Sequence, residues 1–233
     1  MPISRREFLG CAAGASAAGL AGAAGAAGFF AAPSVVRQPG CVLVDPGPAC
    51  PLQESAAGYA AALSSSGISY RRTSYQALAF VPTIIVPAAI TMESDAAARL
   101  KEHVENGSAV LYESGAAFLG QDEFSLHKRV IRSVFGLSLH DPVHLWDSAD
   151  SLKISPYVDF HWPLVTKIRD FSRVVPVGPG DGETIAWFRD LPVAARRRIG
   201  KGTLVYLGSP LGPHFLSGDR EASHWLRAFC AAS

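Results

Sequence analysis

Ser114 is the residue whose surroundings most favour chemistry in this sequence of 233 residues. It follows Glu113 after the apolar run 109–112 and precedes Gly115, so the sequence predicts a sharp turn from a strand into a helix. A hydroxyl group on such a turn is exposed at the carboxyl edge of a sheet, where it can act as a nucleophile. The alternative is that Ser114 only caps the helix that follows.

Two more residues are candidates for the same chemistry. His214 follows the proline-rich loop 208–213 after the last predicted strand, so it is the best candidate for a general base beside Ser114. Glu113 is a candidate base or ligand contact, although a carboxylate that is bonded to neighbouring amides needs no further function. The predicted ligand contacts all lie at or just after strand ends, and they are Glu113, Gly115, Asp45 and Pro87.

No metal site and no cofactor are expected. His140 and His144 have metal-ligand spacing only on a helix, and Pro142 between them argues against a helix. No phosphate-binding or dinucleotide-binding motif occurs in the chain.

Three cysteines lie beyond residue 40, and they are Cys41, Cys50 and Cys230. Their spacing matches neither a zinc site nor a Cys-x-x-Cys motif. Cys41 and Cys50 could form a disulfide in an oxidising compartment. Buried free thiols are equally consistent with the sequence.

The elements that would position these residues alternate between strands and helices in the first half of the chain. Apolar, β-branched runs predict strands over 41–45, 68–72, 83–86 and 109–112, and helical patterns predict helices over 52–66 and 93–106. This alternation predicts an α/β fold, with a doubly wound, mostly parallel sheet that has helices on both faces.

The second half of the chain changes character. Alternating stretches predict an antiparallel extension of the sheet with strands over 184–188, 193–198 and 203–207. Short strands are expected within 137–146, and helices over 124–135 and 219–230.

Three segments, 81–87, 104–115 and 200–210, resemble the class I glutamine amidotransferase-like superfamily, which has a flavodoxin-like α/β fold. The resemblance covers most of the chain from Cys41 onward. The sequence departs from the active members, because Ser114 lies where they have a cysteine, and Ala88 and Ala89 lie where they have glycines. Their terminal His-x-Glu pair is also missing. The resemblance therefore implies a non-catalytic member of the superfamily.

The first residues, 4–10, resemble a twin-arginine export signal, because Arg5 and Arg6 are followed by Glu7 and a Phe-Leu pair. An uncharged stretch rich in Ala and Gly continues to residue 32. The predicted organisation is a signal peptide over 1–32, a linker over 33–40 and one domain over 41–233. The protein is then periplasmic or secreted, and the signal is either cleaved or kept as an anchor.

Composition limits the partners. Outside residues 1–32, which contain Arg5, Arg6 and Glu7, the chain has equal numbers of basic and acidic residues, so it lacks the field that steers nucleic acid. The basic cluster over 196–198, with Lys201, is expected to be a solvated strand end.

The sequence therefore predicts a domain that binds either a small ligand, with a carbohydrate as one candidate, or a partner protein. No nucleic acid binding is expected, and no membrane insertion once the signal is cleaved. The alternative is a serine-nucleophile hydrolase or amidase that uses Ser114 and His214.

Overall fold

A computed structural model describes residues 40–45, 52–90, 92–144, 157–170, 173–178, 180 and 182–233. Residues 38–233 form one compact unit. The predicted signal peptide, the linker as far as residue 39, and Cys50 lie outside the described residues.

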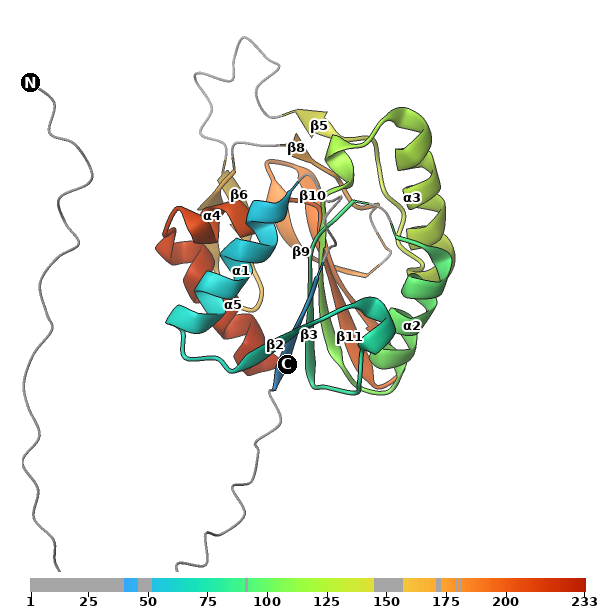
Figure 1. Cartoon of the computed structure of the whole chain (residues 1–233). Coiled ribbons are helices and arrows are strands. Elements are labelled where there is room, and N and C mark those ends of the chain that lie inside the picture. Colours follow the sequence, from blue (N-terminus) through green and yellow to red (C-terminus); the bar gives the residue numbers. More distant parts are fainter. Residues whose placement is uncertain are drawn as a thin grey trace, which may run out of the picture. The chain divides into compact units, whose positions relative to one another are not determined.

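A nine-stranded sheet forms the centre of the unit (Figure 1). In spatial order its strands are β2 (Tyr70–Thr73), β1 (Cys41–Val44), β3 (Thr83–Ala89), β4 (Ala109–Ser114), β11 (Gly202–Leu207), β10 (Leu191–Ile199), β9 (Glu183–Phe188), β6 (Tyr157–Phe160) and β7 (Thr166–Arg169). A separate antiparallel pair consists of β5 (Val143–His144) and β8 (Arg173–Val174).

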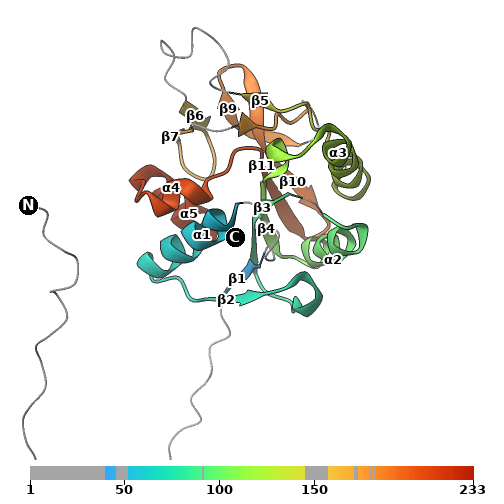
Figure 2. The ribbon, with the colours of Figure 1, turned by 45° about the horizontal axis from the view of Figure 1, so that its top comes forward.

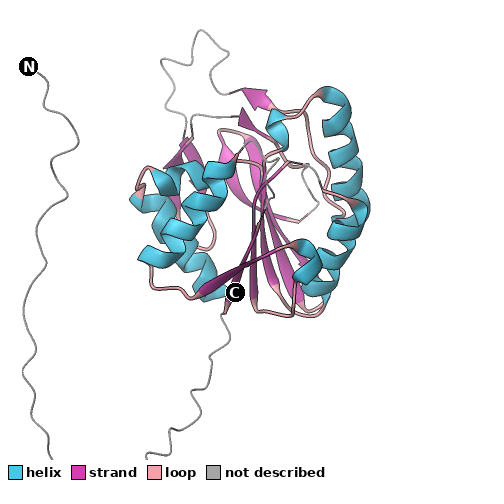
Figure 3. Cartoon of the chain, viewed as in Figure 1, coloured by secondary structure: helices cyan, strands magenta, loops and turns pink. Residues whose placement is uncertain are grey.

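The sheet is parallel from β2 through β11 and antiparallel from β11 through β7. Three helices lie on one face, and they are α1 (Gln53–Ser65), α4 (Gly212–Leu216) and α5 (Arg220–Ala232). The helices α2 (Ser94–Glu105) and α3 (Gln121–Phe135) lie on the other face (Figures 1 and 3). The rotated view shows the same arrangement, with one layer of helices on each face of the sheet (Figure 2). The predicted mixed α/β class with a large sheet is confirmed.

Two hydrophobic cores fill the space between the sheet and its helices. Adjacent side chains of a strand point to opposite faces, so Leu111 and Tyr112 of β4 belong to different cores. The first core contains Tyr59 of α1 and Trp225 of α5. The second core contains Leu100 of α2. All seven residues of β3 are buried, as expected for a strand covered on both faces.

The helix ends follow local chemistry. Gly136 ends α3 in the left-handed conformation, with a φ of 67° that glycine tolerates best. The Asp219 carboxylate caps α5 by accepting a hydrogen bond of 3.0 Å from the Ala222 N–H. In the described part of the chain, no helix is long and apolar enough to cross a membrane.

Three features differ from the sequence-based prediction. β4 continues through Glu113 and Ser114, which were expected to form the turn. The loop that was expected to carry His214 forms the short helix α4, with Pro213 in its first turn. The strands β6 and β7 were not predicted, because their short sequences carry polar residues, and because β6 joins the sheet only by pairing with the distant β9, with β7 paired to β6 at the edge.

Candidate functional site

The buried carboxylate of Glu113 organises the carboxyl edge of the parallel strands. Its Oε1 accepts hydrogen bonds from the Ser55 hydroxyl and from the Ala88 N–H, the latter at 3.2 Å. Its Oε2 accepts from the N–H groups of Leu211 at 2.8 Å and Gly212 at 3.0 Å. One side chain therefore joins β4 to α1, to β3 and to the start of α4.

Burial raises the pKa of Glu113, and the hydrogen bonds from Ser55, Leu211 and Gly212 oppose that rise. The side chain has no exposed surface. Four donors converging on one point form a cradle suited to an anion, and a carboxylate of the protein itself fills this cradle. The position predicted for a base or a ligand contact therefore has a packing role.

Ser114 and His214 lie on opposite sides of the sheet. Ser114 is fully buried, and its Oγ accepts a hydrogen bond of 3.2 Å from the Ala116 N–H. Because side chains alternate along β4, Ser114 points to the face that packs against α2 and α3. His214 belongs to α4, which packs against α1 on the other face. The structure does not bring the predicted nucleophile and base together.

Two of the other three predicted ligand contacts, Gly115 and Pro87, are buried. A Cβ atom on Gly115 would lie 2.8 Å from the carbonyl oxygen of Ala88, so two chain segments meet closely at this point. Ala88 adopts a φ of 42°, which is rare for a residue other than glycine. Pro87 is buried within β3, and Asp45 alone of the predicted contacts is exposed.

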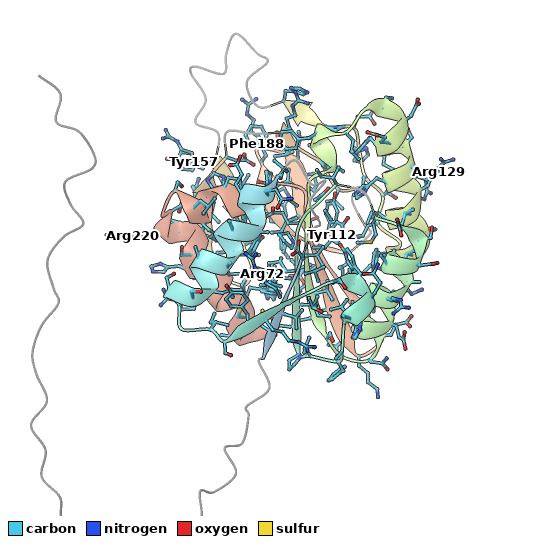
Figure 4. All side chains as sticks on the ribbon, in the orientation of Figure 1. Arg72, Tyr112, Arg129, Tyr157, Phe188 and Arg220 are labelled. Atoms are coloured by element: carbon cyan, nitrogen blue, oxygen red, sulfur yellow. The ribbon has the colours of Figure 1, made fainter. Side chains whose placement is uncertain are left out.

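A second buried polar side chain, His127 of α3, lies beneath the opposite face of the sheet. Its ring centroid is 6.3 Å from that of Tyr112, which lies in the interior of the unit (Figure 4). Within the described residues, neither ring nitrogen of His127 has a hydrogen-bond partner. Burial lowers the pKa of His127 to about 4, so the imidazole is neutral at physiological pH.

The carboxyl edge of the parallel strands is filled by Glu113, whereas a groove lies at their amino-terminal edge. One cavity of about 570 Å³ and another of about 190 Å³ adjoin there and share Arg196 and Thr203 in their walls. Thr203 pairs with Ala109, the first residue of β4, so this groove lies at the end of the strand opposite to Glu113. We call it the Arg196 groove, and its key residues are Trp162, Glu183, Arg196, Arg198, Lys201 and Thr203.

The groove holds Arg196 in a defined position. The guanidinium group of Arg196 lies 4.7 Å from the ring centroid of Trp162. Its Nε donates a hydrogen bond of 3.0 Å to Oε2 of Glu183. The indole N–H of Trp225 in α5 donates to the Trp162 carbonyl oxygen at 2.9 Å, which anchors the segment carrying Trp162. An aromatic wall and fixed polar groups therefore face the same space.

Sequence reasoning missed this groove. The basic cluster was expected to be a solvated strand end, and Arg198 and Lys201 are indeed exposed. The contribution of Trp162 was not predictable, because it comes from a segment distant in sequence that reaches Arg196 only through the pairing of β6 with β9.

No protein-family model and no curated protein matches the sequence. Solved structures are similar in fold. A β-galactosidase from Rahnella sp. R3 aligns at a TM-score of 0.63 and 14% identity, over 82% of this chain and 31% of that one. An exo-β-1,4-mannosidase from Opitutaceae bacterium strain TAV5 aligns at a TM-score of 0.60 and 17% identity, over 82% and 36%.

A cytoplasmic protein from Salmonella typhimurium LT2 is similar over 86% of its own length and 75% of this chain, with a TM-score of 0.55 and 13% identity. The chain spans about a third of the length of the two glycosidases. At these identities the similarity concerns the fold alone.

These comparisons correct the family assignment. The resemblance to class I glutamine amidotransferases and the flavodoxin-like assignment were wrong, because no family model matches and the similar structures include β-galactosidases and a mannosidase. The segment 104–115 resembled that superfamily for a general structural reason. A helix that ends at a glycine such as Gly107, with its φ of 116°, before a buried strand is a general feature of parallel α/β packing. The comparisons do not test the predicted signal peptide, and its residues lie outside the described ones.

Proposed function

We propose that this domain is a non-catalytic carbohydrate-binding module whose ligand occupies the Arg196 groove. The observation that carries the proposal is the pairing of an aromatic ring, Trp162, with a guanidinium group that Glu183 holds in place. The fold similarity to parts of β-galactosidases and a mannosidase supports a role connected with carbohydrate.

The α/β order with helices on both faces also supports a doubly wound arrangement of the parallel half.

The chemistry of the groove suits an acidic sugar. The half-buried Trp162 ring offers apolar surface to the C–H groups of a pyranose where Arg196 leaves it uncovered, and nearby hydroxyl and charged groups bond the sugar oxygens. Arg196, Arg198 and Lys201 carry positive charge, whereas Glu183 is the one acidic residue among the key residues defined above. Because Glu183 already accepts hydrogen bonds from Arg196, the exposed side chains of Arg198 and Lys201 are the groups that would pair with a carboxylate of the ligand. We therefore expect a preference for saccharides that contain a uronate group.

The closed carboxyl edge supports a binding role over a hydrolase. Glu113 is already bonded to four donors, and Ser114 is buried on the opposite side of the sheet from the helix that carries His214. A nucleophile needs a base within hydrogen-bond reach and an open approach for the substrate. Both requirements would demand a rearrangement of α4 and β4.

Isothermal titration of the full chain tests this proposal. The ligands are an oligogalacturonate and a neutral oligogalactoside of equal length. We expect the uronate ligand to bind more tightly, with an affinity that falls as salt is raised. Arg196→Ala should weaken binding at least tenfold. Arg129→Ala is the matched control, because Arg129 projects from α3 away from the sheet (Figure 4). Equal loss in both variants, or no binding of either sugar, would refute the proposal.

We also propose that the protein is exported, and is therefore periplasmic or secreted. Support comes from the sequence, where Arg5 and Arg6 precede a long uncharged stretch of Ala and Gly. A location outside the cytoplasm is compatible with polysaccharide fragments as ligands.

A further inference from the structure

Two cysteines from opposite ends of the described domain line one cavity between β1 and α5. Cys41 is the first residue of β1, and Cys230 is in the last turns of α5. Both line a mostly apolar cavity of about 270 Å³, together with Ile68, Thr83 and Arg227. The start of β1 and the C-terminal end of α5 also lie close together in Figures 1 and 2.

We propose that Cys41 and Cys230 form a reversible disulfide that joins β1 to α5. Both side chains line the same cavity, and Cys230 packs against the hydrophobic core that contains Cys41. Both are free in the structure, so they represent the reduced form. The sequence had suggested a bond between Cys41 and Cys50 instead, and Cys50 lies outside the described residues.

The two thiols differ in reactivity. The hydrogen bond from Cys41 lowers the pKa of the Cys230 thiol, whereas that hydrogen bond and burial raise the pKa of Cys41. Cys230 is also partly exposed, and Cys41 is buried. A thiolate is the attacking species in exchange reactions, so Cys230 is the residue that meets an oxidant first.

The oxidation balances with a small-molecule disulfide as the oxidant. The Cys230 thiolate attacks one sulfur of the oxidant, and the other sulfur leaves as a thiolate. This step leaves a mixed disulfide between Cys230 and one half of the oxidant. Cys41 then loses its proton to solvent, and its sulfur attacks the Cys230 sulfur, which forms the Cys41–Cys230 bond and releases that half of the oxidant as a thiolate. The protein loses two electrons and two protons, and the oxidant becomes two thiols. An oxidising compartment would keep the bond formed, whereas the cytosol would keep it reduced.

The bond would close a loop that contains nearly the whole described domain. A cross-link that spans a long loop restricts the unfolded chain strongly. We expect the oxidised protein to melt about 5 to 10 °C higher than the reduced protein.

Mass spectrometry of the full chain in glutathione redox buffers tests the proposal. Trypsin leaves Cys41 and Cys50 on one peptide, residues 38–71, and Cys230 on residues 228–233. A cross-link between these two peptides could therefore involve either Cys41 or Cys50. The Cys50→Ser variant leaves only Cys41 on the first peptide and keeps the proposed pair. We expect this variant to give a cross-linked peptide under oxidising conditions, with the loss of two hydrogen atoms, and to show the full rise in melting temperature.

Cys230→Ser should show neither the cross-link nor the rise. The proposal fails if folded Cys50→Ser protein keeps both thiols free for alkylation after oxidation. It also fails if the wild type forms only a link between Cys41 and Cys50. A melting temperature that does not rise on oxidation of Cys50→Ser would contradict the proposed stabilisation.

Discussion

At the scale of single residues, the structure reassigns the most suggestive carboxylate of the sequence. Glu113 was a candidate base, and the structure makes it the acceptor for four hydrogen bonds from three surrounding segments. The sequence identified an unusual residue at the correct edge. It did not reveal the role of that residue, because the donors around it belong to α1, β3 and the start of α4, which meet only in the tertiary structure.

Replacing Glu113 by Gln should destabilise the protein by about 1 to 3 kcal/mol at pH 7, since the amide nitrogen would face N–H donors. Because the folded pKa of Glu113 is raised, its contribution is largest below the unfolded value of 4.5 and is lost as pH rises through the folded pKa. Urea unfolding should therefore show a larger advantage of the wild type over Glu113→Gln at pH 5 than at pH 8. The matched control is Glu183→Gln, at a half-exposed carboxylate, which should change stability by less than about 1 kcal/mol. Equal effects in the two variants would contradict the role of Glu113.

His127 should govern stability in acid. Its pKa falls from 6.5 to about 4 on folding, so the stability it contributes is present above pH 6.5 and is lost as pH falls through 4. The full shift corresponds to at most about 3 kcal/mol. In His127→Leu, urea unfolding should show a smaller loss of stability between pH 6.5 and 4 than in the wild type. At pH 7 the variant should be at least as stable, because two unpaired buried nitrogens are removed. An unchanged acid sensitivity would rule out this assignment.

At the scale of elements, the sequence predicted most helices and strands of the parallel half. The predicted helices 52–66 and 93–106 correspond to α1 and α2, because alanine content, apolar spacing and terminal glycines act locally. The prediction failed at α4, where Gly212 and two prolines suggested a loop. The contact between α1 and α4 stabilises that short helix, and no local pattern reports such a contact.

The crossing of α1 and α4 depends on two glycines. A Cβ on Gly58 would lie 1.9 Å from the carbonyl oxygen of Gly212, so the helices touch backbone to backbone. In an exposed helix, Gly→Ala stabilises by about 1 kcal/mol. Here we expect Gly58→Ala to destabilise by at least about 2 kcal/mol in thermal or urea unfolding. Gly40→Ala is the control, since nothing lies within 4 Å of its added Cβ. A stabilised Gly58→Ala variant would contradict the close contact.

At the scale of the whole molecule, the proposed function places the ligand at the edge of the sheet opposite to the one that the sequence suggested. General rules for α/β sheets favour the carboxyl edge. That edge is closed by Glu113 and by the close approach of Gly115 to Ala88. The groove forms where the antiparallel extension meets the parallel half. Arg196 and Thr203 belong to one hairpin, but Trp162 comes from a distant segment, so only the tertiary structure brings it to them.

The proposed export also concerns the whole chain. Changing Arg5 and Arg6 together to Lys should retain the protein in the cytoplasm, because the adjacent arginines are the part of the segment that the pathway would recognise. Cell fractionation with an antibody to the domain measures the distribution. Lys201→Arg serves as the control and should be exported like the wild type. Undiminished export of the double variant would exclude this pathway.

The most direct test of the central claim is a ¹⁵N–¹H spectrum of the full chain during titration with an oligogalacturonate. The chain has four tryptophans, so it gives four indole signals, and Trp162→Phe identifies the one in the groove. We expect the Trp162 indole and the Arg196 Nε–H signals to shift with ligand, while the amides of Ala88, Gly115 and Leu211 stay unchanged. Shifts confined to those three amides would place the ligand at the carboxyl edge and contradict the account.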